Sequence, residues 1–162
     1  MNNERAMNPF PAIIALLDRA RRFLNGGANV LDLGIRVLVA RDFFLSGLTK
    51  IRDWDTTLAL FQDEYHVPVL PPELAAIGGT FGELLFPVLL VLGLGTRFAA
   101  LGLSLVNVMA VVSYWHVLKD LEPALAMHVT WAILLLVPLF HGPGKISLDA
   151  WIWRRWGPVV VN

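Results

Sequence analysis

The 162-residue sequence contains no cysteine. That absence excludes disulfide bonds, thiolate metal ligands and cysteine-held iron–sulfur clusters made by this chain. An excess of one charge is also missing, since 13 basic and 13 acidic residues give a formal net charge of zero. The overall charge therefore gives no indication of a nucleic-acid partner, and none is predicted. Any redox role requires a cofactor or partner from outside the chain.

Long apolar stretches dominate the chain, which is 56% hydrophobic and only 16% charged. This balance exceeds what a soluble domain of this size needs and is typical of an integral membrane protein. Four stretches approach the ~20 residues that cross ~30 Å of hydrocarbon. They are residues 30–50, 74–94, 96–117 and 123–140. The predicted fold class is therefore all-α and integral to the membrane, a four-transmembrane-helix bundle.

The connections between these stretches differ in length. Residues 93–96 are so few that they predict a tight turn between antiparallel neighbours. Residues 51–73 form the longest connection. It is predicted to contain a short surface helix over residues 53–65, followed by an extended return imposed by Pro68, Pro71 and Pro72.

Three regions follow from these patterns. Residues 1–29 predict an N-terminal cytoplasmic amphipathic segment, because apolar residues recur at helical spacing with arginines opposite, as in a helix at the membrane interface. Residues 30–141 are the predicted four-helix transmembrane domain. Residues 142–162 predict a C-terminal cytoplasmic region, in which a Gly-Pro-Gly-Lys and Ser-Leu-Asp motif precedes an interfacial tail rich in tryptophan and arginine.

An even number of spans places both termini on one side of the membrane. Eight lysines and arginines flank the spans on the terminal side and three on the other, which predicts that both termini are cytoplasmic. A reporter that is active only in the cytoplasm should therefore be active when fused after Asn162. A reporter active only outside the cytoplasm, fused at the same place, should stay silent, and its activity would contradict this orientation.

Ionisable and polar residues interrupt the apolar stretches. A charge at the centre of a span costs at least ~2.5 to 3.5 kcal/mol, so such residues usually face protein, water or a ligand. The first stretch contains Arg36, Arg41 and Asp42, the second Glu83 and the third Asn107. Because Arg41, Glu83 and Asn107 fall at similar depths, we predict a polar cluster near the membrane midplane that holds a ligand or a proton.

The charges of the first stretch do not share one helical face. At 100° per residue, Arg36 and Lys50 lie on one face, whereas Arg41 and Asp42 lie on the opposite one. A single packing stripe does not cover both faces. This pattern predicts a central helix, a cavity that reaches it, or a second protein on one side, either another membrane subunit or a second copy in a homo-oligomer.

Glu83 has a second unusual feature. Pro87, four residues later, has no N–H, so the backbone carbonyl of Glu83 lacks its usual helical hydrogen bond. The predicted donor to the Glu83 carboxylate is Arg41, or Arg36 across the bundle. Two interpretations are open. The carboxylate accepts protons or holds a ligand, or it forms a structural Arg–Glu pair that stabilises the bundle.

His116 and His128 are expected to approach the outer surface together, at the end of the third stretch and early in the fourth. Histidines in this position suit copper or zinc, or contact with a quinone carbonyl. The alternative is a hydrogen-bonded structural histidine, particularly for His128. The sequence has no ordered series of metal ligands, so copper and quinone are both hypotheses.

Several separated motifs together resemble the DoxX family of small four-helix membrane proteins of bacteria and archaea. The resemblance runs from about residue 31 to residue 150. Its strongest part is Gly142 to Asp149, with Lys145 where the family often has arginine. The other matching positions are Arg36, Phe43, Gly47, Lys50, Glu83, Pro87 and the segment 92–100 that contains Arg97.

The resemblance implies a multi-pass protein of the bacterial or archaeal cytoplasmic (inner) membrane that is associated with redox systems, including thiosulfate oxidation with quinone as acceptor. Residues 65–74 further resemble a DoxX subgroup found with copper-handling peptides. By the same resemblance, the positions to carry over are Arg36, Lys50, Glu83, Arg97, Lys145 and Asp149. We expect Asp149 to accept backbone N–H groups or to pair with Arg97, as a structural latch or as part of a binding site.

Three functions are consistent with these observations. The first is a membrane subunit of a quinone-linked redox or respiratory system, in which the polar cluster holds a quinone, a lipid or a proton path. The second is a non-catalytic accessory subunit that docks a larger respiratory or oxidase complex. The third is a copper-handling accessory membrane protein. A stand-alone enzyme has less support, because the sequence shows no nucleophile–base set or cofactor motif.

Overall fold

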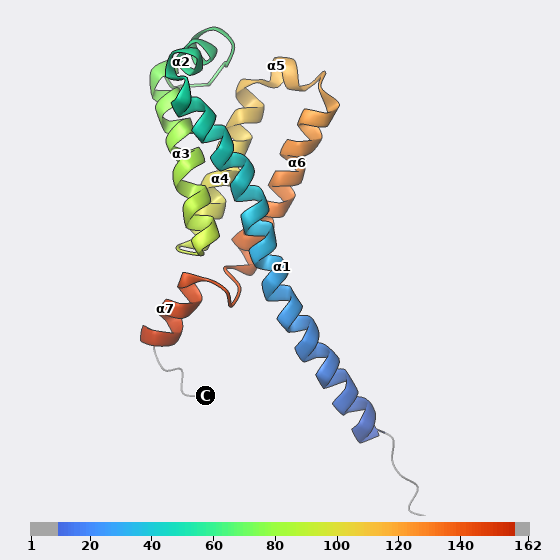
Figure 1. Ribbon diagram of the computed structural model, residues 1–162. Helices are drawn as coiled ribbons and strands as arrows, with labels where there is room; N and C mark the ends of the chain where they lie inside the picture. Colours follow the sequence, from blue (N-terminus) through green and yellow to red (C-terminus); the bar gives the residue numbers. More distant parts are fainter. Residues whose placement is uncertain (1–9, 158–162) are drawn as a thin grey trace, which may run out of the picture.

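The computed structural model describes residues 10–157, in which helices are joined by short loops and there is no strand. The outermost parts of the two predicted flanking regions, residues 1–9 and 158–162, lie outside the described residues. Within the described range, four helices are long and apolar enough to span a membrane. They are α1 (Phe10–Arg52), α3 (Pro72–Leu92), α4 (Thr96–Ser113), and α6 (Glu122–Leu136) with its continuation η1 (Val137–His141). The predicted membrane-spanning four-helix bundle is confirmed (Figure 1).

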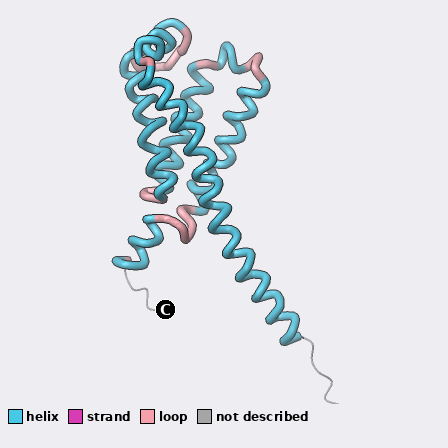
Figure 2. The backbone as a smooth tube through the Cα atoms, viewed as in Figure 1, coloured by secondary structure: helices cyan, strands magenta, loops and turns pink. Residues whose placement is uncertain are grey.

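The four spanning helices surround a shared apolar core. Val39 and Phe43 of α1 pack with Leu90 of α3, Leu103 of α4 and Leu135 of α6. The helices run up and down with short connections, as the loops in Figure 2 show. The chain therefore enters and leaves the bundle at the same end, which we call the terminal end. The opposite end carries α2 and α5 (Figure 1).

The N-terminal amphipathic segment continues into the first span. The described residues 10–29 are helical, but α1 runs as one helix of 43 residues and its first part projects away from the bundle (Figure 1). Gly26 and Gly27 lie in this region. Each glycine lowers helix stability by about 1 kcal/mol relative to alanine, yet the helix continues through both. The exposed apolar side chains of this part include Phe10, Leu17 and Phe23. Burial of this segment in the membrane interface stays a prediction.

The longest connection contains the predicted short helix, α2 (Trp54–Asp63). Asp53 caps its start, because one carboxylate oxygen accepts the backbone N–H of Thr56 at 3.1 Å. The side-chain and backbone hydrogen bonds from Thr56 hold the pKa of Asp53 below its ordinary value. Phe61 of α2 then packs against Ala75 and Ala76 of α3. This contact fixes the connection over one end of the bundle.

The turn between α3 and α4 is tight, as predicted. Gly93 and Gly95 both adopt left-handed backbone conformations, with φ of +66° and +56°, which glycine accepts without steric cost. The other two short helices lie at opposite ends. Helix α5 (Trp115–Leu118) follows α4, and α7 (Leu148–Trp156) follows the last span at the terminal end (Figure 1).

Candidate functional site

A cavity of about 510 Å³ lies between the four spanning helices, in the half of the bundle that faces α2 and α5. We call it the bundle cavity. Most of its wall is apolar or aromatic, including Phe43, Phe86 and Trp131. Its polar groups are few, and they come from different helices. This combination is typical of a site for a small, largely apolar molecule that carries a few polar atoms.

One face of α1 supplies a polar stripe to the cavity wall. Asp42, Ser46 and Lys50 all line the cavity, and they follow one another at intervals of four residues. Side chains at this spacing lie above one another on a helix. Ser46 was not among the predicted site residues, although its four-residue spacing from Asp42 and Lys50 was the signal that could have found it.

Lys50 is the partner of Glu83. Its Nζ atom lies 2.5 Å from a Glu83 carboxylate oxygen and 3.0 Å from the Ser46 hydroxyl. The prediction that Arg41 or Arg36 donates to Glu83 is therefore wrong. The side chains are only 19% exposed for Lys50 and 10% for Glu83, so the pair is mostly shielded from solvent. A shielded pair is strongly coupled, because removing one charge leaves the other unpaired in a poor solvent.

A glycine explains why these two residues meet. A Cβ atom on Gly47 would lie 3.1 Å from Glu83 Cβ and 2.9 Å from side-chain atoms of Leu84. Glycine therefore lets α1 and α3 approach closely at this level. Lys50 is three residues further along α1 and so reaches the carboxylate of the adjacent helix. Position 47, which carries part of the family resemblance, thus has a packing role beside the ion pair.

Arg41 and Asp42 point in different directions. Asp42 lines the bundle cavity and accepts a hydrogen bond from Trp131 Nε1 at 3.2 Å. Arg41 has a side chain that is 70% exposed and pairs with Asp42 Oδ1 at 3.1 Å. The prediction that both lie on the face of α1 opposite Lys50 is thus wrong for Asp42. Adjacent helical residues are 100° apart, so one can face the cavity while its neighbour faces outward.

Asn107 and His128 form a hydrogen-bonded pair beside the cavity. The Asn107 side-chain oxygen lies 2.7 Å from His128 Nδ1, and its amide donates to the His128 carbonyl oxygen at 2.9 Å. The His128 ring packs edge-on against Trp131, with the ring centroids 5.1 Å apart. The structure therefore divides the predicted polar cluster. Asp42 and Glu83 line the cavity, Asn107 pairs with His128, and Arg41 lies outside the cavity.

His116 has different neighbours from His128. Its ring packs against His66, with centroids 4.8 Å apart, and against Tyr114. Within residues 10–157, no group of three or more histidine or acidic side chains is placed to hold a metal ion. The metal site at His116 and His128 stays a prediction, and the described residues add no third ligand to it. The structure instead gives His128 the hydrogen bonds expected of a structural histidine.

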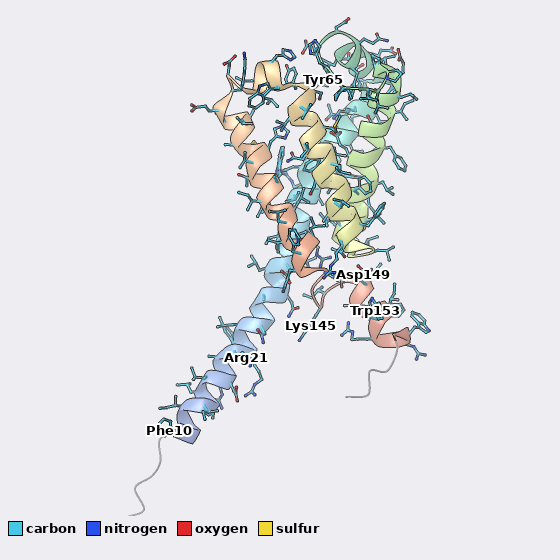
Figure 3. All side chains as sticks on the ribbon, turned by 180° about the vertical axis from the view of Figure 1, so that it is seen from behind. Phe10, Arg21, Tyr65, Lys145, Asp149 and Trp153 are labelled. Carbon is cyan, nitrogen blue, oxygen red and sulfur yellow. The ribbon has the colours of Figure 1, made fainter. Side chains whose placement is uncertain are left out.

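Two tyrosines line the cavity at the end opposite the termini. Tyr65 and Tyr114 pack edge-on, with centroids 5.1 Å apart, and Tyr65 is labelled at this end in Figure 3. Burial, reinforced by Tyr114 and the acidic residues Glu64 and Glu83, raises the pKa of Tyr65. Its phenol is protonated at neutral pH, as that of an ordinary tyrosine is, and is able to donate a hydrogen bond.

Arg36 belongs to the terminal end of the bundle and not to the cavity. The side chain is almost fully buried and donates to the carbonyl oxygens of Leu90 at 3.1 Å, Val91 at 3.4 Å and Ile146 at 2.5 Å. The first two carbonyls are at the C-terminal end of α3, where helical partners run out. The guanidinium therefore joins α1, the end of α3 and the segment that follows the last span.

Asp149 completes the same connection (Figure 3). Its carboxylate accepts the backbone N–H groups of Gly95 at 2.8 Å and Thr96 at 2.9 Å, and the Thr96 hydroxyl at 2.9 Å. The expected acceptance of backbone N–H groups is confirmed, and it caps the start of α4. Arg97 donates instead to the carbonyl oxygen of Phe140. We call Arg36, Asp149 and the segment 142–149 the terminal latch.

Lys145 and Asp32 make further contacts in the latch region. The backbone N–H of Lys145 donates to the side chain of Asn29 at 2.9 Å, so this motif position contributes its main chain. Asp32, which the sequence analysis missed, is buried beside Gly144 and lies 3.3 Å from His141 Nδ1. Asp32 precedes Arg36 by one helical turn, and that spacing was the available signal. These contacts favour a structural role for the motif.

Taken together, the cavity offers a cationic donor, an acidic group and hydroxyl groups on an otherwise apolar and aromatic wall. A flat apolar molecule with oxygen acceptors would find both stacking surfaces and a donor there. The Lys50–Glu83 pair places both charges on this wall. In the terminal latch, by contrast, Arg36 and Asp149 bond mainly to backbone groups.

Comparison with known proteins assigns the chain to a family through one family model. A protein of Haemophilus influenzae (strain ATCC 51907 / DSM 11121 / KW20 / Rd), described as an uncharacterized protein, is 30% identical over 135 residues, which cover 78% of this chain and 85% of that protein. No solved structure matches the chain significantly. The family model described as DoxX matches residues 31–116, more than half of the chain. The protein is a member of the DoxX family.

Proposed function

We propose that the protein is a membrane subunit of a quinone-linked redox or respiratory system, and that the bundle cavity holds the quinone headgroup. The observation that carries this proposal is the Lys50–Glu83 pair on the wall of an otherwise apolar cavity. A quinone ring requires apolar and aromatic contacts for its faces and hydrogen-bond donors for its carbonyl oxygens. Lys50 supplies a charged donor and Glu83 a group that exchanges protons.

Reduction of a quinone to a hydroquinone takes up two electrons and two protons. The chain has no cysteine, so the electrons would come from a donor subunit or a cofactor held by a partner. In this proposal Glu83 would pass protons to the bound headgroup, while Phe43 and Trp131 would contact its ring. The chain itself would bind and orient the quinone and would not act as a stand-alone oxidoreductase.

The same proposal includes a location. We place the protein in the cytoplasmic membrane with both termini cytoplasmic, on the basis of the unequal distribution of lysine and arginine across the spans. Other membrane subunits would then supply electrons from within or beside the bilayer. The competing proposal is an accessory subunit that docks a larger complex and binds no quinone. That role does not require an open cavity.

Filling the cavity should weaken quinone binding. Ala110 lines the cavity on α4, and Ala110→Phe adds a ring there without altering Lys50 or Glu83. We expect the affinity for decylubiquinone to fall by about ten-fold or more, because the added ring competes for the same volume. Binding is measured on protein in lipid nanodiscs by equilibrium dialysis, followed by extraction and absorbance of the retained quinone.

Ala126→Phe provides the matched control. Ala126 is exposed on α6 and does not line the cavity, so the same side chain is added where no effect on binding is expected. Equal retention of decylubiquinone by wild type and Ala110→Phe would contradict the proposal. So would a failure of the wild-type protein to retain the quinone above the level of empty nanodiscs.

A further inference from the structure

Arg41 places a cation on the outward face of a membrane-spanning helix. Its side chain is 70% exposed, and the partner recorded for it within residues 10–157 is one oxygen of Asp42, 3.1 Å from a guanidinium nitrogen. A guanidinium carries five N–H donors. Hydrocarbon offers no acceptor for the others. Arg41 therefore requires an acceptor from outside the chain.

An apolar groove runs beside this side chain. It has a volume of about 300 Å³ and lies between α1 and α3. Arg41 is the charged residue of its wall, and the remaining residues are apolar. They are Val37, Ala40 and Phe44 of α1 with Pro87, Val88, Val91 and Leu92 of α3. The groove, which we call the α1–α3 groove, is separate from the bundle cavity and shares no lining residue with it.

The depth of Arg41 decides which acceptor it can meet. Arg41 shares the groove with Pro87 and Val88, which precede the end of α3 at Leu92 by five and four residues. At 1.5 Å per residue, Arg41 lies about 6 to 8 Å inside the terminal end of that helix. Side chains on a helix tilt toward its N-terminus, and α1 begins at the terminal end. A long arginine side chain can thus extend to the phosphate level of that leaflet.

The chemistry of the groove suits a lipid. The α1–α3 groove has a volume of about 300 Å³ and is apolar except for Arg41. An acyl chain is thin and flexible enough to lie along such a groove. An apolar groove with a single arginine in its wall therefore matches a lipid chain joined to a phosphate.

We propose that the α1–α3 groove binds a phospholipid of the terminal-end leaflet. The lipid phosphate accepts hydrogen bonds from the free donors of Arg41, and one acyl chain lies against Val37, Val88 and Val91. The site satisfies the guanidinium without a second protein chain. It also explains why Asp42 can face the bundle cavity while its neighbour carries an exposed charge. The proposal is independent of what the bundle cavity holds.

Lipid retention tests this site. The protein is purified in mild detergent, loaded with dioleoylphosphatidylglycerol, washed, and examined by native mass spectrometry. We expect the wild-type chain to retain one lipid, and Arg41→Gln to retain about ten-fold less at equal lipid concentration, because a charge-assisted contact to the phosphate is lost. Arg52→Gln is the matched control, since Arg52 is exposed at the other end of α1 and should retain lipid like wild type.

A second variant tests the groove itself while Arg41 is unchanged. Val88→Trp fills the α1–α3 groove from α3 and should also reduce retention, since the acyl chain loses its place. Equal retention by wild type and both groove variants would overturn the proposal, as would a wild-type chain that retains no lipid. A membrane protein that copurifies with wild type and is lost in Arg41→Gln, with lipid retention unchanged, would assign the groove to a protein partner instead.

Discussion

Replacing Arg36 with methionine should lower the free energy of unfolding by about 3 kcal/mol, because charge-assisted hydrogen bonds are lost and carbonyl groups remain buried without them. The guanidinium donates to Leu90, Val91 and Ile146, and so holds the end of α3 and the segment after the last span against α1. Methionine fills a similar volume and cannot donate. The expected loss is therefore one of hydrogen bonding rather than of packing.

Unfolding in mixed micelles by increasing sodium dodecyl sulfate, followed by far-ultraviolet circular dichroism, measures this loss. Arg36→Lys should recover less than half of it, since an ammonium group does not reproduce the planar fork that reaches both α3 and Ile146. Arg22→Met, on the exposed part of α1, is the control and should change stability by less than about 0.5 kcal/mol. If Arg36→Met is as stable as Arg22→Met, the terminal latch does not depend on Arg36.

A local measurement separates release of the latch from general loss of stability. Lys145 is exposed within the segment that Arg36 and Asp149 hold. Trypsin should cut after Lys145 faster in Arg36→Met than in wild type under native conditions, because the segment opens more often. Cleavage at an unchanged rate would mean that the Asp149 contacts alone fix the segment.

The sequence was sufficient to predict the spans and the turns because these depend on local composition. The length of each apolar stretch determines how many helices cross the membrane, and Gly93 and Gly95 permit the turn between two of them. The spans and this turn need no knowledge of which helix faces which. Asp149 was expected, from the family resemblance, either to accept backbone N–H groups or to pair with Arg97, and the structure shows the first alternative at the start of α4.

The partners of the buried charges were not predictable in the same way. Arg36 donates to backbone carbonyls, which every residue possesses and no sequence pattern distinguishes. Glu83 pairs with Lys50 because Gly47 allows α1 and α3 to approach at that level, which depends on the rotation of both helices. Asp42 was grouped with Arg41 on the basis of helical angles relative to Arg36, although it follows the same four-residue stripe as Lys50. Helix rotation is a property of the packed bundle.

The charged residues within the apolar stretches lie in three different places in the bundle. Arg36 serves the terminal latch, Arg41 is exposed on the outside of the bundle, and Lys50 with Glu83 faces the bundle cavity. Each location gives its charge a different acceptor or donor. Substitutions at the three places should therefore have different effects on stability, lipid retention and quinone binding. The Lys50–Glu83 pair allows the most decisive test.

Glu83→Gln alone should destabilise the protein by about 3 kcal/mol, because it leaves the Lys50 cation unpaired among apolar groups. Lys50→Met alone should cost a similar amount by leaving Glu83 unpaired. The double variant should be within about 1 kcal/mol of wild type, since neither charge then needs a partner. Sodium dodecyl sulfate unfolding of the four proteins gives the coupling between the two side chains as a double-mutant cycle. Costs that simply add would show that the pair is not coupled.

Quinone binding by the same four proteins decides between a structural and a ligand-holding pair. If the pair only stabilises the bundle, the double variant should regain decylubiquinone binding together with its stability. If Lys50 donates to the quinone carbonyl, the double variant should be stable and yet bind about ten-fold more weakly, because a charge-assisted hydrogen bond is lost from the headgroup. We expect the second result, since both side chains line the cavity and Lys50 also contacts Ser46 on the same wall. Restored binding in a stable Lys50→Met/Glu83→Gln protein would reject the proposed role of the pair while leaving the fold and the terminal latch unaffected.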